Sequence, residues 1–177
     1  MKRLLPMTLI AATTLGMSAT ARAANPPLVI TLKDSNRVLT LARPWDQGGT
    51  TITLSPFEQA PGQGFWLRPV RKPEERLFQI VSQRSQLCLD TNTSHEDGTP
   101  ITQKPCMNAD YQIFHVSDRG ADGHRELRGK FSDKCLAAPQ GDGYSGSQLV
   151  QWKCTGRDNQ RFRISPAQAT ASTGATP

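Results

Sequence analysis

Apolar residues, aromatic residues and helical patterns are all scarce in this sequence of 177 residues. Apolar residues make up 36% and aromatic residues 6%, and so low an apolar content excludes a bundle of membrane spans. No window of 12 residues carries an apolar stripe at helical spacing, which excludes a coiled coil. The chain has 14 glycines and 13 prolines but is not a collagen. This composition is typical of one loop-rich, all-β domain.

Motifs that carry enzymatic chemistry are also missing. The three histidines form no H-E-x-x-H or other metal-ligand spacing, and there is no phosphate loop or nucleotide fingerprint. The segment from Gly143 to Ser147 only superficially resembles a nucleophile elbow, because Ser147 stands where that motif has its last glycine. The net charge of +6 is not gathered into a basic cluster. We therefore predict a protein that is not an enzyme, needs no cofactor or metal and binds no nucleic acid.

The two ends of the chain have the composition of segments outside the fold. Lys2 and Arg3 precede a mildly apolar stretch, and Ala21-Arg22-Ala23 matches an A-x-A cleavage site. We interpret residues 1–23 as a signal peptide rather than a membrane anchor, because the stretch is too short to span a bilayer. The mature protein is then secreted or periplasmic, with no transmembrane segment and a net charge of +3. Residues 166–177 lack large apolar side chains and are predicted to be a disordered tail.

The four cysteines are expected to form disulfides after export. Cys88, Cys106, Cys135 and Cys154 contain no C-x-x-C pair, which argues against a zinc ribbon or a thioredoxin-type redox site. An even number of cysteines in an exported protein indicates two disulfides. The cysteines taken alone allow three pairings.

An internal repeat of about 48 residues runs through the chain. Three nine-residue strings begin with glycine, have an aliphatic residue in fourth place and are followed six residues later by Gln-x-Phe. The strings are 49–57, 98–106 and 146–154, and the Gln-x-Phe units are 63–65, 112–114 and 160–162. Upstream, Leu39-Thr40-Leu41 is aligned with Leu87-Cys88-Leu89 and Lys134-Cys135-Leu136. Such a period is typical of repeat architectures.

Each repeat contains short segments that alternate apolar and polar residues, separated by turn-forming residues. One repeat of about four short strands cannot form a core alone, so the three must pack together. A propeller needs at least four blades. The sequence therefore predicts an all-β protein with the β-trefoil fold, spanning residues 24–165.

The repeat also selects one disulfide pairing. Cys88 and Cys106 hold the same repeat positions as Cys135 and Cys154, which predicts the bridges Cys88–Cys106 and Cys135–Cys154. In the first repeat the alignment puts Thr40 and Phe57 at these two positions, so we expect that repeat to have no crosslink and to be the least constrained.

These motifs carry a family resemblance. Cys88-Leu89-Asp90, the string that ends at Cys106 and the following Gln-x-Phe resemble the ricin B-type lectin repeat, also called the Q-x-W repeat. The last repeat is similar through Gln151-Trp152-Lys153-Cys154. The resemblance covers roughly residues 28 to 165 and implies a sugar-binding β-trefoil. In that family an Asp after the first Cys-x, an aromatic ring two places before the second Cys and an Asn before the Gln hold the sugar.

Carried over residue by residue, this pattern is incomplete in every repeat. The last repeat has the ring, Trp152, and the amide, Asn159, but Ala137 replaces the acid. The middle repeat has the acid, Asp90, but Lys104 replaces the ring and Tyr111 replaces the Asn. The first repeat has Ala42, Ser55 and Gly62 and none of the three groups.

The resemblance therefore implies carbohydrate binding through Trp152, Asn159 and Asp90. Three alternatives stay open: Asp90 as a turn residue, Trp152 as a core residue, and Asp142 in the Gly-rich loop as a replacement acid. In that loop Tyr144 is either a second ring or, as we prefer, part of a solvated hairpin tip. The Gln of each Gln-x-Phe is expected to be structural.

Two functions fit these expectations. The first is a secreted module that binds a cell-surface glycan or glycolipid. Its size, its cysteine-free first repeat and its degenerate sites resemble the ricin-like A and C subunits of cytolethal distending toxins, and the missing lipobox favours the C-like role. The partners would then be a catalytic toxin subunit and a second lectin-like subunit. The second function is an interaction or inhibitor protein without sugar affinity, with Trp45, Phe65 and Trp66 as its contact surface.

Overall fold

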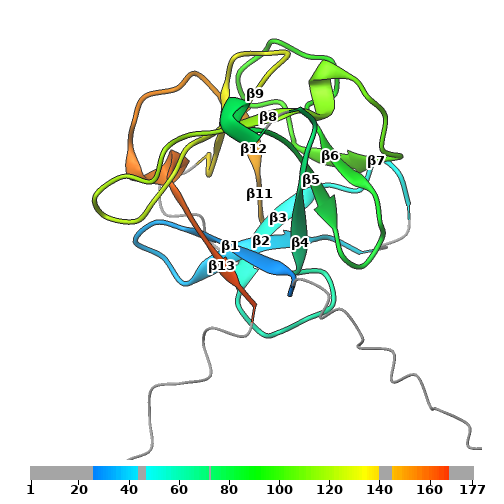
Figure 1. Ribbon diagram of the computed structural model, residues 1–177. Helices are drawn as coiled ribbons and strands as arrows, with labels where there is room; N and C mark the ends of the chain where they lie inside the picture. Colours follow the sequence, from blue (N-terminus) through cyan, green and yellow to red (C-terminus); the bar gives the residue numbers. More distant parts are fainter. Residues whose placement is uncertain (1–25, 44–46, 72, 140–144, 168–177) are drawn as a thin grey trace, which may run out of the picture.

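The computed structural model describes residues 26–43, 47–71, 73–139 and 145–167. Within them the chain forms thirteen β-strands and three short 3₁₀-helices (η1–η3), with no α-helix, so the all-β prediction is confirmed (Figure 1). The strands are β1 (Leu28–Leu32), β2 (Arg37–Leu41), β3 (Ile52–Pro56), β4 (Phe65–Pro69), β5 (Leu77–Ser82), β6 (Cys88–Asp90), β7 (Thr102–Lys104), β8 (Phe114–Val116), β9 (Leu127–Gly129), β10 (Cys135–Ala137), β11 (Ser147–Gln148), β12 (Val150–Trp152) and β13 (Phe162–Pro166). The 3₁₀-helices are η1 (Pro73–Glu75), η2 (Asp110–Gln112) and η3 (Asp158–Gln160).

Six strands close into a barrel. Antiparallel pairing runs from β13 through β1, β4, β5 and β8 to β9. The ring closes where Arg125, just before β9, pairs with Phe162 at the start of β13 through two backbone hydrogen bonds of 2.8 Å. In Figure 1 the first strand (blue) and the last strand (red) therefore lie side by side. Closure leaves the barrel without a free edge strand.

Three hairpins, one from each repeat, meet on a pseudo-threefold axis. They are β2–β3, β6–β7 and β10–β12. The aliphatic residues in fourth place of the strings are Ile52, Ile101 and Leu149, and all three are fully buried. Each donates its backbone N–H to the carbonyl of the next, so that three hydrogen bonds of 2.8 Å form a closed cycle. Complete burial at this junction explains why the fourth place is aliphatic in every repeat, and the threefold cycle confirms the β-trefoil.

The glycine that opens each string has a conformation that favours glycine. Gly49, Gly98 and Gly146 have φ angles of 86°, 84° and 85°, in a region that residues with a Cβ rarely adopt. Each donates its N–H to a hairpin carbonyl of the following repeat, at Gln103, Gln151 and Leu54 respectively. The glycines thus let the chain turn where adjacent repeats join.

The aromatic residue of each Gln-x-Phe unit is a core residue. Phe65, Phe114 and Phe162 are fully buried and belong to one hydrophobic cluster with the aliphatic residues of the barrel and the hairpins. This corrects the suggestion that Phe65 belongs to a contact surface. Trp66 is half-buried, and Trp45 lies outside the described residues.

The first repeat has a different register from the one predicted. Val38 pairs with Thr31 as Cys88 pairs with Val81 and Cys135 with Arg128. Val38, not Thr40, therefore occupies the cysteine position, and Thr40, not Ala42, is the counterpart of Asp90. The predicted alignment of the first repeat is thus displaced by two residues, which is the period with which side chains alternate along a strand. A shift of two therefore leaves the apolar pattern of Val38-Leu39-Thr40-Leu41 on the same face.

Both disulfides predicted from the repeat are present. Cys88 is bonded to Cys106 and Cys135 to Cys154, with Cα–Cα distances of 5.0 Å in each case. In the first repeat the same two places hold buried Val38 and half-buried Phe57. Two apolar side chains thus stand there in place of the two cysteines.

Candidate functional site

A buried glutamine organises the segment behind each hairpin. Gln160 accepts a hydrogen bond at Oε1 from the backbone N–H of Thr155 (2.7 Å) and donates from Nε2 to the carbonyl of Lys153 (2.8 Å). Gln112 and Gln63 make the equivalent pair of bonds in their repeats. All three are at most 2% exposed. As expected from the sequence, each glutamine has a structural role: it holds the backbone of the segment that follows the hairpin.

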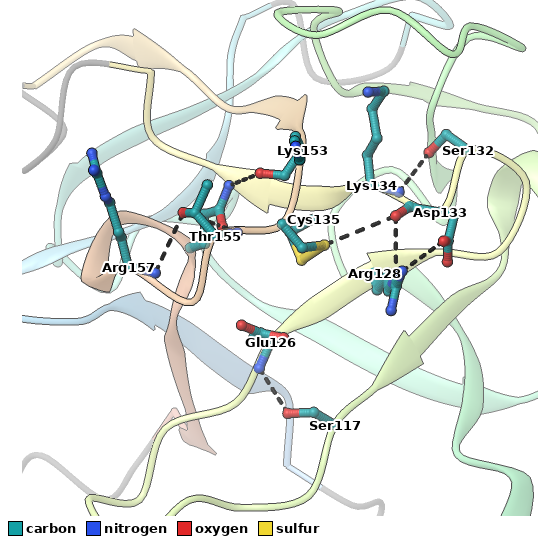
Figure 2. The surroundings of a disulfide bond; sticks show 12 residues. Ser117, Glu126, Arg128, Ser132, Asp133, Lys134, Cys135, Lys153, Thr155 and Arg157 are labelled. Carbon is teal, nitrogen blue, oxygen red and sulfur yellow. Dashed lines mark hydrogen bonds and ion pairs between the residues drawn. A yellow bond between two sulfur atoms is a disulfide. The ribbon is translucent and has the colours of Figure 1, made fainter.

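In the last repeat, a pocket of about 300 Å³ lies beside Gln160. Ala137 at the end of β10, Trp152 at the end of β12 and Asn159 within η3 line it, together with Thr155 and Arg157 from the connecting segment. The structure thus brings Trp152 and Asn159 together, as the sequence alignment implied. Figure 2 shows the nearby Cys135 with Lys153, Thr155 and Arg157 around it.

The indole of Trp152 is exposed at this pocket. Its exposed fraction is 42%, and in the described residues only one other large apolar side chain, Met107 at 49%, is classed as exposed. One edge of the ring faces the β6–β7 loop, where a Cβ on Gly98 would lie 3.4 Å from Cζ3. The core alternative for Trp152 is therefore excluded. An exposed ring beside a pocket can stack on an apolar surface of a ligand.

Asn159 and Ala137 set the polar character of the pocket. Asn159 donates from Nδ2 to the carbonyl of Ala138 (2.9 Å), and its own carbonyl accepts from the N–H of Ala138 (2.9 Å). Within the described residues its Oδ1 has no hydrogen-bond partner and remains available as an acceptor. Ala137 is buried and contributes no polar side chain. The site therefore keeps the ring and the amide and has no carboxylate among its described lining residues.

Arg157 is a lining residue that the sequence analysis missed. Its side chain is exposed, and among the described residues its guanidinium has no ion pair or hydrogen-bond partner. In Figure 2 it extends away from the Arg128–Asp133 ion pair, which lies on the other side of Cys135. A sequence signal was available, because the equivalent residues of the other repeats are Ala60 and Ala109. A charged residue in one repeat alone stands out in such an alignment.

Asp97 is an acidic residue near Trp152, on the β6–β7 loop. Its Oδ1 accepts from Nζ of Lys134 (2.6 Å) and from the backbone N–H of Lys153 (2.8 Å). The Lys134 hydrogen bond is the main cause that lowers the pKa of Asp97 below its ordinary value. Asp97 does not line the pocket. Its bonds instead join the middle repeat to the last hairpin.

Asp90 lies apart from this pocket, in the middle repeat, and its side chain is fully buried. Its Oδ1 accepts from the backbone N–H of Asn92 (2.7 Å) and lies 3.2 Å from Nζ of Lys104, and its Oδ2 accepts from Nε2 of Gln112 (2.9 Å). Lys104 thus takes the place of the ring and neutralises the acid. Tyr111 stands where the Asn would be, and its ring lies nearly perpendicular to that of Phe131, with an interplanar angle of 84°. Asp90 has the contacts of a turn residue, and a role in sugar binding stays a prediction.

The first repeat holds a closed hydroxyl network in the corresponding place. Thr40 Oγ1 and Ser55 Oγ are 2.6 Å apart, and Nε2 of Gln63 donates to both, at 3.3 and 3.2 Å. No acid or ring belongs to this network. Asp142 and Tyr144, residues 1–23 and residues 168–177 lie outside the described part of the chain.

The described residues hold no group of three or more His, Cys, Asp or Glu side chains placed to bind a metal ion. They also form no helix with the length and apolar content needed to cross a membrane.

Comparison with solved structures supports the fold. A designed threefold-symmetric protein, ThreeFoil, is 22% identical, with a TM-score of 0.72 over 77% of this chain and 96% of its own. The earthworm R-type lectin C-half, solved in complex with GalNAc, is 20% identical, with a TM-score of 0.60 over 80% of this chain and 99% of its own. A chain of the Haemophilus ducreyi cytolethal distending toxin is 13% identical, with a TM-score of 0.66 over 84% of this chain and 89% of its own.

Sequence comparison identifies the family. No curated protein sequence matches the chain. The family model of the ricin-type beta-trefoil lectin domain matches residues 76–175, which is more than half of the chain and contains both disulfide-bonded repeats. The cyclic packing of three hairpins, the Gln-x-Phe units and this match lead to one conclusion: the chain belongs to the ricin-type β-trefoil lectin family.

Proposed function

We propose that this protein is a secreted carbohydrate-binding module whose main sugar site is the pocket of the last repeat. The observation that carries the proposal is the exposed indole of Trp152 on the wall of a pocket that it shares with Asn159. Family membership and the GalNAc complex of the earthworm lectin support a saccharide as the ligand class.

The pocket offers two complementary contacts for a sugar ring. The indole buries the apolar C–H face, and the free Oδ1 of Asn159 accepts a hydrogen bond from a hydroxyl. A carboxylate acceptor, which would discriminate hydroxyl geometry most strongly, is missing from the described lining. A single site of this kind should bind with a millimolar Kd, or about −4 kcal/mol.

The proposed biological setting is the delivery subunit of a bacterial toxin, in a C-like role. Residues 1–23 would be removed on export, and the module would begin at residue 24. It would extend beyond residue 165, where the sequence placed its end, because Pro166 pairs with Leu28 and Ala167 donates its N–H to the carbonyl of Pro27; the tail would follow Ala167. Support comes from the two disulfides, which suit an oxidising compartment, and from the similarity in fold to a chain of the H. ducreyi toxin. The partners would be a nuclease subunit and a second lectin-like subunit. A nuclease gene beside the gene for this protein would support this role, and a neighbouring protease or glycosidase gene would oppose it.

The test is a glycan array with the mature, oxidised protein, followed by titration of the best ligand against variants. Trp152→Ala should weaken binding about tenfold, because the stacking contact is lost. Met107→Ala is the matched control, since it truncates the other exposed apolar side chain, which lies in the middle repeat. Both variants should unfold at the same denaturant concentration as wild type. Equal affinities for Trp152→Ala and wild type would place any binding elsewhere.

One observation favours a second function, an interaction module without sugar affinity. None of the three repeats presents a free carboxylate at the family's acid position, since Asp90 is buried against Lys104 and the other two positions hold Thr40 and Ala137. A protein that binds no glycan on the array but captures a subunit encoded by a neighbouring gene would establish this reading instead.

A further inference from the structure

The pocket of the last repeat has an unusual balance of polar groups for a site that holds neutral sugars. Neutral sugars present many hydroxyl donors, which a carboxylate satisfies well. Here the acid position is Ala137, and the one charged side chain in the described lining is Arg157. The described lining therefore lacks the acidic acceptor and contains a cationic donor.

The guanidinium of Arg157 is free to bind a ligand. Among the described residues it makes no ion pair, in contrast to Arg76, Arg128 and Arg161, each of which is paired with an aspartate. Asp97, the acid described near Trp152, is held by Lys134 and does not line the pocket. No acidic side chain of the described lining would thus repel an anion.

We infer that this pocket binds a saccharide that carries a carboxylate or a sulfate, with the anionic group on Arg157 and the sugar ring on Trp152. This inference rests on the proposed function and adds the class of ligand. A planar guanidinium presents paired N–H donors that match two oxygens of a carboxylate or sulfate. Trp152 and Arg157 line the same pocket of about 300 Å³, which suits a monosaccharide better than a long chain.

The experiment titrates the mature, oxidised protein with three methyl glycosides and follows the tryptophan fluorescence and amide chemical shifts. The probes are N-acetylneuraminic acid for the carboxylate, 3-sulfated galactose for the sulfate, and unmodified galactose as the neutral sugar. We expect one or both charged probes to bind at least about tenfold more tightly than galactose, with an affinity that falls as salt is raised. The two charged probes distinguish a carboxylate from a sulfate as the recognised group.

Variants then assign the preference to the arginine. Arg157→Gln should remove the advantage of the charged probes, a loss of about tenfold, and leave galactose binding within about twofold. Arg68→Gln changes the net charge equally at an exposed position near the end of β4 and is the matched control, with no expected effect. Arg157→Lys should recover part of the loss, because it keeps the charge without the paired donors.

The outcomes separate this inference from the proposed function. Galactose could bind more tightly than either charged probe, in a way that depends on Trp152, while Arg157→Gln leaves all affinities unchanged. This result would overturn the inference and keep the sugar site. Loss of galactose binding in Asp142→Asn would also overturn it, because the acid would then come from the Gly-rich loop. Absence of binding to every probe and to the whole glycan array would overturn both.

Discussion

Asp90 shows how one family position can serve different purposes in different repeats. In the middle repeat its carboxylate is fully buried and bound by the side chains of Lys104 and Gln112 and by the backbone N–H of Asn92. In the last repeat the position is Ala137, and the neighbouring ring is exposed instead. A buried charge with three partners is expected to stabilise its surroundings only while all of them remain.

Asp90→Ala should therefore lower stability rather than glycan affinity. The change removes the acceptor of the Lys104 amine and of the Asn92 backbone N–H, and one of the two acceptors of Nε2 of Gln112, which keeps the carbonyl of Pro105. This should lower the free energy of unfolding by about 2–3 kcal/mol. The measurement is urea unfolding of the oxidised protein, with the affinity for its best glycan measured on folded material. Asp110→Ala is the control, because Asp110 is half-exposed and paired with Lys130 at the surface, where the loss should be under about 1 kcal/mol. Unchanged stability together with lost affinity would establish Asp90 as the sugar ligand.

At the scale of elements, the hairpins carry both the crosslinks and the candidate site. Each disulfide joins the first strand of a hairpin to the segment that follows its last strand, and Cys135 pairs with Trp152 in the β10–β12 register. The β2–β3 hairpin has five paired positions, against three in each of the others. A longer hairpin gives the first repeat backbone hydrogen bonds where the other repeats have a covalent bond.

The two disulfides should have similar effects on stability and different effects on binding. Replacing either Cys88 and Cys106 or Cys135 and Cys154 with alanines should lower the free energy of unfolding by about 3 kcal/mol, as loops of this length predict. Glycan affinity should fall only in the Cys135/Cys154 variant, because that bridge fixes the strand that carries Trp152. Each double variant is the control for the other. Equal losses of affinity in both would mean that the site does not depend on the local crosslink.

At the scale of the whole molecule, an ion cluster fastens the first repeat to the last. Lys33 lies 3.1 Å from Asp122 and 2.8 Å from Asp158, and Arg161 lies 3.0 Å from Asp122. The backbone N–H of His124 is the largest influence on Asp122, followed by Lys33, and together these contacts lower its pKa to about 2 from an ordinary value of 3.8. Backbone hydrogen bonds join the same segments: Lys33 donates to the carbonyl of Arg161, and Arg125 and Phe162 bond each other.

Asp122 should make the protein less stable in acid. Because its pKa is lower in the folded protein, its stabilisation is present above pH 3.8 and is lost as the pH falls towards 2. Asp122→Asn should therefore reduce stability at neutral pH and flatten the loss of stability between pH 4 and 2, as followed by thermal unfolding. Asp118→Asn removes an exposed partner of Arg76 and serves as the control, with little expected change. An acid profile for Asp122→Asn that parallels wild type would contradict this assignment.

The sequence by itself determined the trefoil, the disulfide pairing and the presence of Trp152 and Asn159 in one repeat. These follow from features that recur along the chain: a glycine, an aliphatic residue and Gln-x-Phe at one period. The register of the first repeat was not determined, because alternation with a period of two is unchanged by a shift of two residues. Only backbone pairing placed Val38 opposite Thr31.

Only the tertiary structure decided which polar groups are available to a ligand. The position of Asp90 in the family pattern implied a sugar contact, yet Lys104 and Gln112 approach its carboxylate from different segments and bury it. Arg157 belongs to no family motif, yet the turn into η3 places it in the lining of the same pocket as Trp152. Whether a side chain is free depends on what the fold brings against it, and such contacts between distant segments leave no periodic trace in the sequence.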